Sequence, residues 1–378
     1  MRTGRSVHTL AETDLRREIV STIDQAVEVD GDKLMQFVFR AVDEVGSTLN
    51  TALVVMGDKL GLYRALAGAG GLSASELAER TGTAERYVRE WLNAQAAGGY
   101  VKYDPDSGRY ALPPEQSVAL TDPESPAYLP GFFQIALGSV IDSPTIVDRA
   151  RTGDGFGWHE HVHDVHEGCE RFFRPGYHAH LISEWLPALE GVVEKLERGA
   201  RVADVGCGHG ASTILMARSF PNSTFVGWDY HDGSIETARR RAGDAGLAER
   251  VRFEVAPAAA YGGAGYDLVT MFDCLHDMGD PVGAARHVRS TLAPDGTWMI
   301  VEPAAGDRIE DNFNPVGRAY YGFSTLLCTP SSLAQEVGLA LGAQAGEARI
   351  RDVVEAAGLT RFRRAAETPF NLVFEARH

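Results

Sequence analysis

A short segment, Val202–Gly210 (VADVGCGHG), combines an apolar run, an acidic residue and alternating glycines. Arg201–Val205 has the composition of a buried strand, and Ala211–Ser219 has that of a helix start. A strand that turns tightly through glycines into a helix directs backbone N–H groups towards whatever lies above the sheet. We therefore expect a small-molecule site here, the alternative being a tight turn without a ligand. The three glycines are Gly206, Gly208 and Gly210.

A second acidic position follows on the next expected strand. Thr224–Trp228 is followed at once by Asp229, about twenty residues after the glycines, where a carboxylate can accept hydrogen bonds from ribose hydroxyls. Nicotinamide sites use a similar turn, but the spacing here is G-x-G-x-G, and Ala211 replaces the last glycine of G-x-G-x-x-G.

The fourth expected strand leads into a segment with candidate catalytic side chains, Phe272–Met278 (FDCLHDM). Ligands of doubly wound sheets bind at the carboxyl ends of the strands, so Asp273 and His276 are expected where two reactants meet. Histidine titrates near neutrality and can act as a general base. The alternative is a histidine that caps a helix or packs in the core.

These segments resemble two known motifs. VADVGCGHG resembles motif I of the class I S-adenosylmethionine (SAM) methyltransferases, and FDCLHDM resembles the L-H-D-W stretch of small-molecule O-methyltransferases, with Met278 in place of Trp. In that family the histidine is the base, and a glutamate, here Glu302, orients it. The resemblance implies SAM as cofactor, and we expect it to be bound by Asp204, Gly206, Gly208, Gly210, Asp229, Tyr230, Asp273 and Tyr177.

The chain departs from the family pattern at two places. A second family glutamate has no firm counterpart, since Gln344 lies near the expected position and Glu347 one helical turn away. Ala256–Ala258 stands where an acidic residue usually lies near the adenine, so backbone and apolar contacts are expected there.

Longer stretches resemble a family of bacterial SAM-dependent methyltransferases with an N-terminal winged-helix domain. They are Glu170–Tyr177, Val202–Thr213, Phe272–Pro281 and Asn314–Pro330. The resemblance implies a homodimer and a SAM site.

The expected fold is α/β, a Rossmann-like class I methyltransferase sheet behind a helical winged-helix domain. From Ala200, strands alternate with helices, which is typical of a parallel sheet covered on both faces. The expected strands are Arg201–Val205, Thr224–Trp228, Val251–Val255, Tyr266–Phe272 and Thr297–Glu302, followed by a closing hairpin of Arg361–Ala366 and Phe370–Ala376.

The N-terminal third predicts a winged helix. Leu34–Met56 is amphipathic with an excess of apolar residues, which suggests a subunit interface. A capping box opens a helix at Ser73, Glu85–Ala97 forms a second helix, and Tyr100–Tyr103 with Arg109–Leu112 form a hairpin. We expect an arm at 1–30, a winged-helix and dimerisation domain at 31–120, a helical linker and lid at 121–198, and a SAM-binding domain at 199–378. Prolines predict an irregular connection over 113–131.

Aromatic residues gather where a lid over the site is expected. Ring faces suit a sulfonium cation or an apolar acceptor, although core packing explains some of them. The candidate acceptor-binding residues are Phe132, Phe133, Trp158, Phe173, Tyr320, Tyr321 and Phe323, and Phe172 belongs to the same group. The histidines of His159–His166 resemble a hydrolase metal motif with its aspartate one place early, so no metal is expected.

Bulk properties narrow the class of protein. The formal net charge of −16 disfavours nucleic acid or an anionic membrane as partner. The four cysteines are far apart, and neither a membrane span nor a signal-peptide core stands out, which predicts a cytoplasmic protein. We expect a SAM-dependent methyltransferase for a small, fairly apolar acceptor, at oxygen with His276 as base. The alternatives are a nitrogen, carbon or sulfur acceptor methylated by proximity, or a SAM-sensing winged-helix transcription regulator.

Overall fold

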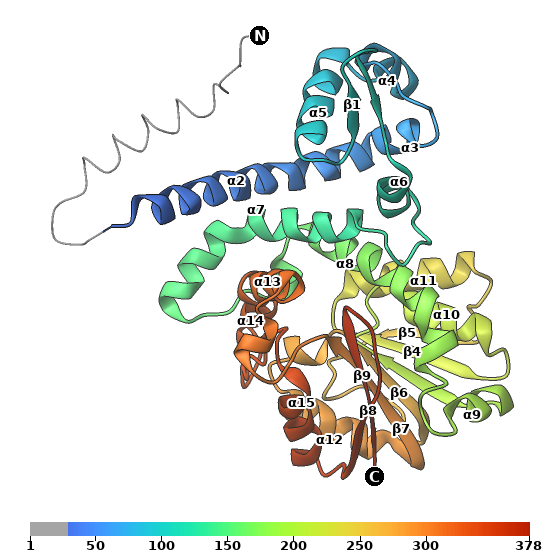
Figure 1. Ribbon diagram of the computed structural model, residues 1–378. Coiled ribbons are helices and arrows are strands. Elements are labelled where there is room, and N and C mark those ends of the chain that lie inside the picture. The colour runs from blue at the N-terminus through green and yellow to red at the C-terminus, as the bar shows by residue number, and fades with distance from the viewer. Residues whose placement is uncertain (1–28) are drawn as a thin grey trace. The chain divides into compact units, whose positions relative to one another are not determined.

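The computed structural model describes residues 29–378, so most of the predicted arm at 1–30 lies outside the described residues. The chain divides into two compact units, one ending at Pro113 and the other beginning at Pro114 (Figure 1). The first unit contains α2 (Gly31–Lys59), α3 (Leu62–Leu66), α4 (Ala74–Thr81), α5 (Glu85–Ala97), β1 (Lys102–Asp104) and β2 (Arg109–Ala111).

The first unit is the predicted winged helix. Its capping box is present at Ser73, whose hydroxyl accepts from the Glu76 backbone while the Glu76 carboxylate accepts from the Ser73 backbone. Trp91 on α5 is 1 % exposed and donates to the Leu53 carbonyl on α2 at 2.8 Å. Gly57 allows this close approach, because a Cβ there would lie 2.5 Å from the Trp91 ring. The long helix is thus joined to the domain at its C-terminal end.

The second unit carries the sheet and the helices that cover it. Its helices are α6 (Pro114–Thr121), α7 (Pro130–Thr152), η1 (Trp158–Glu160), α8 (His163–Gly176), η2 (Tyr177–Trp185), α9 (Val192–Arg198), α10 (Ala211–Ser219), α11 (Asp232–Asp244), η3 (Leu275–Asp277), α12 (Pro281–Thr291), η4 (Ile309–Asn312), α13 (Pro315–Phe323), η5 (Ser324–Cys328), α14 (Thr329–Leu333) and α15 (Gly346–Ala356). Its strands are β3 (Arg201–Val205), β4 (Thr224–Asp229), β5 (Val251–Val255), β6 (Tyr266–Phe272), β7 (Leu292–Pro303), β8 (Arg361–Glu367) and β9 (Asn371–Arg377).

The sheet has the strand order β5-β4-β3-β6-β7-β9-β8. The first five strands are parallel, and β9 runs antiparallel to both β7 and β8, so the predicted closing hairpin is present. Side chains alternate between the two faces. Val202 and Val301 pack in a core with α9, α10 and α11, whereas Ala203 and Ile300 pack in a core with α12 and α15 (Figure 1). This is the doubly wound arrangement that the alternation of strands and helices predicts.

The predicted irregular connection over 113–131 is wrong in part. Pro114–Thr121 forms α6, and Pro130 opens α7. Proline is favoured in the first turn of a helix because the N–H that it lacks has no helical partner there. These prolines therefore mark helix starts. No helix among residues 29–378 is long and apolar enough to cross a lipid bilayer.

Candidate functional site

The glycine turn after β3 adopts a backbone that side chains disfavour. Gly206, Gly208 and Gly210 have φ values of 75°, 52° and 79°. A Cβ on Gly206 would lie 2.7 Å from the Cys274 sulfur, and one on Gly210 would lie 2.6 Å from the Phe253 ring. The turn therefore requires glycine for conformation at all three positions and for space at two.

Asp204, on the strand before the turn, stabilises the helix start that follows the turn. Its side chain is fully buried, and its Oδ2 accepts from the hydroxyls of Ser212 and Thr213 at 2.6 and 2.5 Å, while Oδ1 accepts from Thr270 at 2.9 Å. Burial raises the pKa of Asp204, and the three hydroxyl bonds oppose that rise. Asp204 and Gly210, both predicted to bind cofactor, do not line the cavity described next. Asp204 holds the start of α10 against the sheet.

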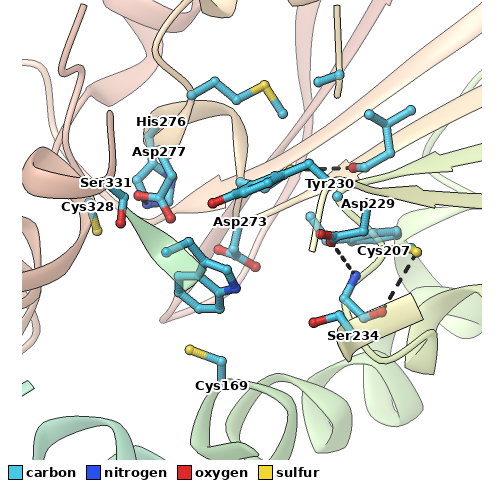
Figure 2. Close-up of a pocket in the computed structure, with 18 of the residues that line it drawn as sticks. Cys169, Cys207, Asp229, Tyr230, Ser234, Asp273, His276, Asp277, Cys328 and Ser331 are labelled. Carbon is cyan, nitrogen blue, oxygen red and sulfur yellow. Dashed lines mark hydrogen bonds and ion pairs between the residues drawn. The ribbon is translucent and has the colours of Figure 1, made fainter. Parts of the chain in front are cut away.

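A cavity of about 800 Å³ opens above the carboxyl ends of β3, β4 and β6. Figure 2 shows Asp229 and Ser234 at one end of it, with His276, Asp277, Cys328 and Ser331 at the other end and Tyr230 and Asp273 between them. Of the predicted site residues, Gly206, Gly208, Asp229, Tyr230, Asp273, Tyr177 and His276 line it.

Asp229 lies at the end of β4, beside the glycine turn. Its Oδ2 accepts from the Gly208 backbone N–H and its Oδ1 from the His231 backbone N–H, both at 2.9 Å. Burial raises the pKa of Asp229, although these N–H groups favour its charged form. Ala256–Ala258, the segment without the usual acidic residue, also lines this end of the cavity. This end of the cavity thus offers a ligand one carboxylate, that of Asp229, and an apolar surface formed by Ala256–Ala258.

Asp273 occupies the middle of the cavity in a strained conformation. Its φ of 50° lies in the left-handed region, which a non-glycine residue seldom adopts. Asn371 on β9 donates to its Oδ1 at 2.8 Å, and Oδ2 has no hydrogen-bond partner among the described residues. Burial, with the Glu302 carboxylate, raises the pKa of Asp273 well above its ordinary value. Its free oxygen can therefore offer a polar contact to a ligand.

His276, on η3, is held by a glutamate as the motif predicts. Its Nδ1 lies 2.5 Å from Glu302 Oε2, and the other oxygen of Glu302 accepts from the Leu275 backbone N–H at 3.0 Å. The side chains of His276 and Glu302 are each 4 % exposed. Glu302 thus fixes both the ring and the short helix that carries it.

The second nitrogen of His276 faces a residue that sequence reasoning missed. Its Nε2 lies 3.1 Å from Asp277 Oδ1, and Cys328 on η5 lies beside the pair. Burial lowers the pKa of His276, but the Asp277 and Glu302 carboxylates outweigh it and raise that pKa well above the ordinary value. Asp277 directly follows His276 in the sequence, and this adjacency could have identified it as a site residue. Cys328 comes from another part of the chain, and no feature of the sequence links it to His276.

Neither substitute for the second family glutamate contacts His276. Glu347 pairs with Arg351 and Arg364, both at 2.7 Å. The Gln344 side-chain amide donates to the Ala343 carbonyl. Asp277 is therefore the second carboxylate beside the ring.

Aromatic rings from α7, α8 and α13 form one wall of the cavity. Phe132 stacks on Phe172 at 4.5 Å between ring centroids and lies 5.3 Å from Phe323. Of the predicted acceptor-binding residues, Phe132, Trp158, Phe173, Tyr320 and Phe323 line the cavity. Phe133 and Tyr321 do not, because one turn of a helix presents only some of its side chains to one side.

The histidines of His159–His166 do not gather around one point. His161 lies 2.8 Å from Asp142 through Nδ1, and His166 lies 2.8 Å from the Trp158 carbonyl through Nε2. Burial lowers the pKa of both rings. Among residues 29–378, one group of three possible metal ligands was found, and none of these histidines belongs to it.

Two protein-family models match the chain, one in each part. A model described as an Rv2258c-like winged HTH domain matches residues 48–122. A model described as a methyltransferase domain matches residues 196–337. The second match covers the glycine turn, Asp229, His276 and Glu302.

Curated relatives match over part of their length. The 27-O-demethylrifamycin SV methyltransferase of Amycolatopsis mediterranei is 36 % identical over 119 residues, which is 29 % of this chain and 43 % of the relative. A ubiquinone biosynthesis O-methyltransferase of Ruegeria pomeroyi is 33 % identical over 98 residues, which is 26 % of this chain and 39 % of the relative. The chain thus spans about two fifths of these relatives.

Solved structures resemble the whole chain in fold. The mitomycin 7-O-methyltransferase MmcR has a TM-score of 0.66 at 19 % identity, covering 92 % of this chain and 100 % of its own. Human N-acetylserotonin methyltransferase, solved in complex with SAM, has a TM-score of 0.66 at 16 % identity, covering 94 % and 99 %. The chain thus carries a winged helix-turn-helix domain match followed by a methyltransferase domain match, and it shares the fold of these solved methyltransferases.

Proposed function

We propose that this protein transfers the methyl group of SAM to a hydroxyl oxygen of a small, fairly apolar molecule. One observation carries the proposal. A single cavity joins a glycine turn and strand-end carboxylate to a buried histidine held by a glutamate. The size of the cavity, about 800 Å³, lies in the range of small-molecule sites.

The end of the cavity at Asp229 fits the adenosine part of the cofactor. Gly206 and Gly208 place no side chain between their backbone and a ligand, and Asp229 offers carboxylate oxygens to ribose hydroxyls. Ala256–Ala258 provides an apolar surface for the adenine. SAM, when bound, supplies the electrophilic methyl group. Asp273 lies further along the cavity (Figure 2), where the methionine part would extend, and Tyr177 also lines the cavity.

The end at His276 fits the acceptor. Glu302 accepts a hydrogen bond from the Nδ1–H of His276, so in the neutral ring Nε2 is the atom that can take the hydroxyl proton of an acceptor. The Asp277 carboxylate also contacts Nε2, so it must move away from the ring when the acceptor hydroxyl binds there. The wall of Phe132, Phe172 and Phe323 excludes water and suits an apolar or aromatic acceptor.

Cofactor binding is tested by titrating S-adenosylhomocysteine into the full-length protein by calorimetry. Asp229→Ala should bind much more weakly than the wild type, whereas Asp232→Ala, which changes an exposed carboxylate of α11, should not. Unchanged affinity in Asp229→Ala would contradict the assignment. Circular dichroism must confirm that the variant still folds, because Asp229 also holds Gly208 and His231.

The base is tested by His276→Ala. Production of S-adenosylhomocysteine with an acceptor found among small phenols should fall by roughly 10²–10⁴-fold, the contribution of a positioned base, while cofactor affinity stays nearly intact. If turnover stays at the wild-type level, the acceptor needs no deprotonation. A nitrogen, sulfur or carbon acceptor methylated by proximity would then be favoured.

The rival function, a SAM-sensing regulator, finds no support in the helix that would read DNA. The two basic residues of α5, Arg86 and Arg89, pair with Glu90 and Glu85 on the same helix. DNA-reading helices normally present a basic face. A low-salt DNA-binding assay that detected tight binding would reverse this preference.

We also propose a homodimer formed through α2. Four of its apolar side chains are more than half exposed in the single chain: Phe37, Val42, Val45 and Leu49. A helix face of this kind is normally covered by another surface.

A further inference from the structure

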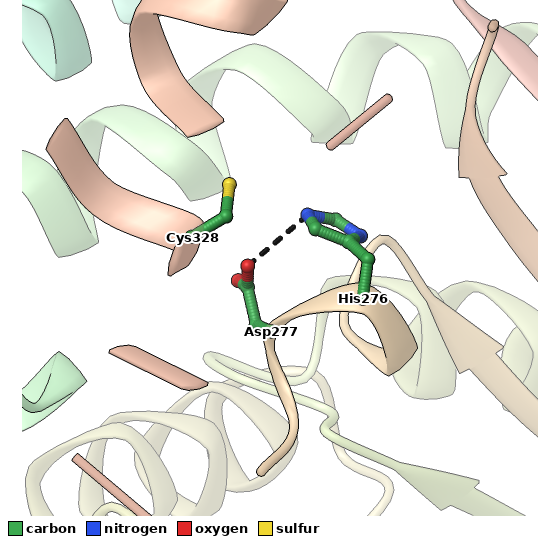
Figure 3. Close-up of side chains that lie close together, drawn as sticks. All are labelled: His276, Asp277 and Cys328. Carbon is green, nitrogen blue, oxygen red and sulfur yellow. Dashed lines mark ion pairs between the residues drawn. The ribbon is translucent and has the colours of Figure 1, made fainter. Parts of the chain in front are cut away.

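Three side chains with metal-binding atoms meet at the acceptor end of the cavity. They are His276 and Asp277 on η3 and Cys328 on η5 (Figure 3). A ring nitrogen of His276, a carboxylate oxygen of Asp277 and the sulfur of Cys328 lie within 4.8 Å of one another, and Nε2 is the nitrogen that lies near Asp277. All three residues line the cavity. The group thus combines nitrogen, oxygen and sulfur donors beside a space that a small molecule can enter.

Two carboxylates flank the His276 ring and give this group an excess of negative charge. Nδ1 lies 2.5 Å from a Glu302 oxygen, and Nε2 lies 3.1 Å from an Asp277 oxygen. Both carboxylates would attract a cation bound beside Nε2. Among the described residues, no lysine or arginine lines the cavity, so the protein itself places no permanent cation there.

We propose that His276, Asp277 and Cys328 form a binding site for a thiophilic divalent metal ion, of which Zn²⁺ is the best match. Zinc accepts imidazole, thiolate and carboxylate ligands together, whereas Mg²⁺ and Ca²⁺ prefer oxygen alone. Zinc-to-ligand bonds of about 2.0–2.3 Å place tetrahedral ligand atoms about 3.3–3.6 Å apart. The 3.1 Å between histidine and aspartate is close to that separation, and rotation of the Cys328 side chain can adjust the sulfur.

The surroundings support this assignment. Glu302 accepts from the nitrogen of His276 that would not bind metal, the arrangement that orients histidine ligands in many zinc sites. Three protein ligands leave a fourth position that faces the cavity. On binding, the Cys328 S–H bond breaks, the thiolate sulfur bonds to the metal, and the proton goes to solvent.

Metal binding has a functional consequence, which rests on the proposed function. A metal ion on Nε2 occupies the lone pair that would take the acceptor's proton. Zinc should therefore inhibit methyl transfer, and a chelator should restore it. Metal binding itself is measured without cofactor or acceptor, so it can fail or succeed independently of methyl transfer.

The test uses full-length protein freed of metal with EDTA and then dialysed. Zn²⁺ titrated by calorimetry should bind at one equivalent, and Co²⁺ should give tetrahedral d–d bands with a thiolate charge-transfer band. Cys328→Ser should abolish the charge-transfer band and weaken zinc binding at least tenfold, and Asp277→Asn should also weaken it at least tenfold. Cys169→Ser is the matched control, because Cys169 lines the same cavity outside the group and should leave both signals unchanged.

Two results would overturn the proposal. One is the absence of saturable zinc binding to wild-type protein that still binds S-adenosylhomocysteine. The other is equal zinc affinity in Cys328→Ser, Asp277→Asn and the wild type, with unfolding midpoints showing that all three fold. A third variant, Glu302→Gln, should weaken zinc binding by about 10–100-fold if Glu302 orients the ligand.

Discussion

His276 is held differently at its two nitrogens, and this difference decides what the ring can do. Glu302 is buried, and its second oxygen is bound to the backbone of η3, so it cannot leave Nδ1 without disturbing the helix. Asp277 is 22 % exposed at its side chain and borders the cavity. The Nδ1 contact is therefore a fixed support, whereas the Nε2 contact can be exchanged for a ligand.

The support by Glu302 predicts a graded effect of mutation. Glu302→Gln keeps an acceptor oxygen but loses the charge, and weakening a charge-assisted hydrogen bond by about 1.5 kcal/mol corresponds to roughly tenfold in rate. Turnover should fall about tenfold, less than in His276→Ala. Steady-state production of S-adenosylhomocysteine measures this, with Glu347→Gln as a control that does not contact the ring. Equal losses in Glu302→Gln and His276→Ala would indicate that the glutamate itself takes the proton.

At the scale of single residues, the sequence could predict a contact where both partners belong to a known motif. His276 follows β6 and Glu302 lies near the end of β7, which pairs with β6 in parallel, so the fold brings them together. Cys328 could not be found, because a π-helical turn after α13 places it. Phe133 and Tyr321 do not line the cavity for a related reason: which side of a helix faces a cavity depends on packing outside that helix.

Among the elements, the helices and strands with strong local signals could be predicted closely. β3, β5 and β6 have the predicted bounds. β3 lies between Gly199 and Gly206, β6 begins directly after Gly265, and β5 alternates apolar with charged residues, which is typical of a strand. β7 begins earlier than predicted, at Leu292, since its pairing with β6 extends beyond the apolar run. α6 was missed because Pro113, Pro114 and Pro123, at its start and just after its end, resemble a loop in sequence.

The capping box of α4 predicts how the winged-helix unit responds to acid. The Ser73 backbone N–H donates to Glu76 and Arg109 binds both its oxygens, and these contacts lower the pKa of Glu76 to about 2. A lowered pKa stabilises the folded state above the unfolded value of 4.5, and this contribution is lost as the pH falls through about 2.

Glu76→Gln should therefore lower the unfolding midpoint at pH 6, and its difference from the wild type should shrink towards pH 2. Thermal unfolding followed by circular dichroism measures this. Glu79→Gln, an exposed change on the same helix, serves as the control. A difference that stays constant with pH would show that the charge of Glu76 is not what stabilises the cap.

On the scale of the whole molecule, α2 has more apolar surface than its own unit covers. Phe37 and Leu49 are 67 % and 65 % exposed, whereas Val54 at the other end of the helix is fully buried. The first part of α2 is thus free to pack on a second copy of the chain.

The predicted homodimer can be broken at this surface. Leu49→Glu combined with Val42→Glu places two charges in an apolar contact, where unpaired charge is costly. Light scattering should give about twice the 40.9 kDa chain mass for the wild type and one chain mass for the double variant. Ser47→Glu, on another side of the helix, should leave the dimer intact. A wild-type monomer at micromolar concentration would refute the proposal.

The pairing of β9 has a consequence for how the protein is made. β9 lies between β7 and β8, and its first residue, Asn371, holds Asp273. The carbonyl of Phe370, just before β9, accepts from Tyr320. During synthesis on the ribosome, the site therefore cannot close until this segment has emerged and docked. Until then the edge of β7 is unpaired, and an unpaired edge is where nascent sheets associate wrongly. Chaperones that hold the nascent chain would protect this edge.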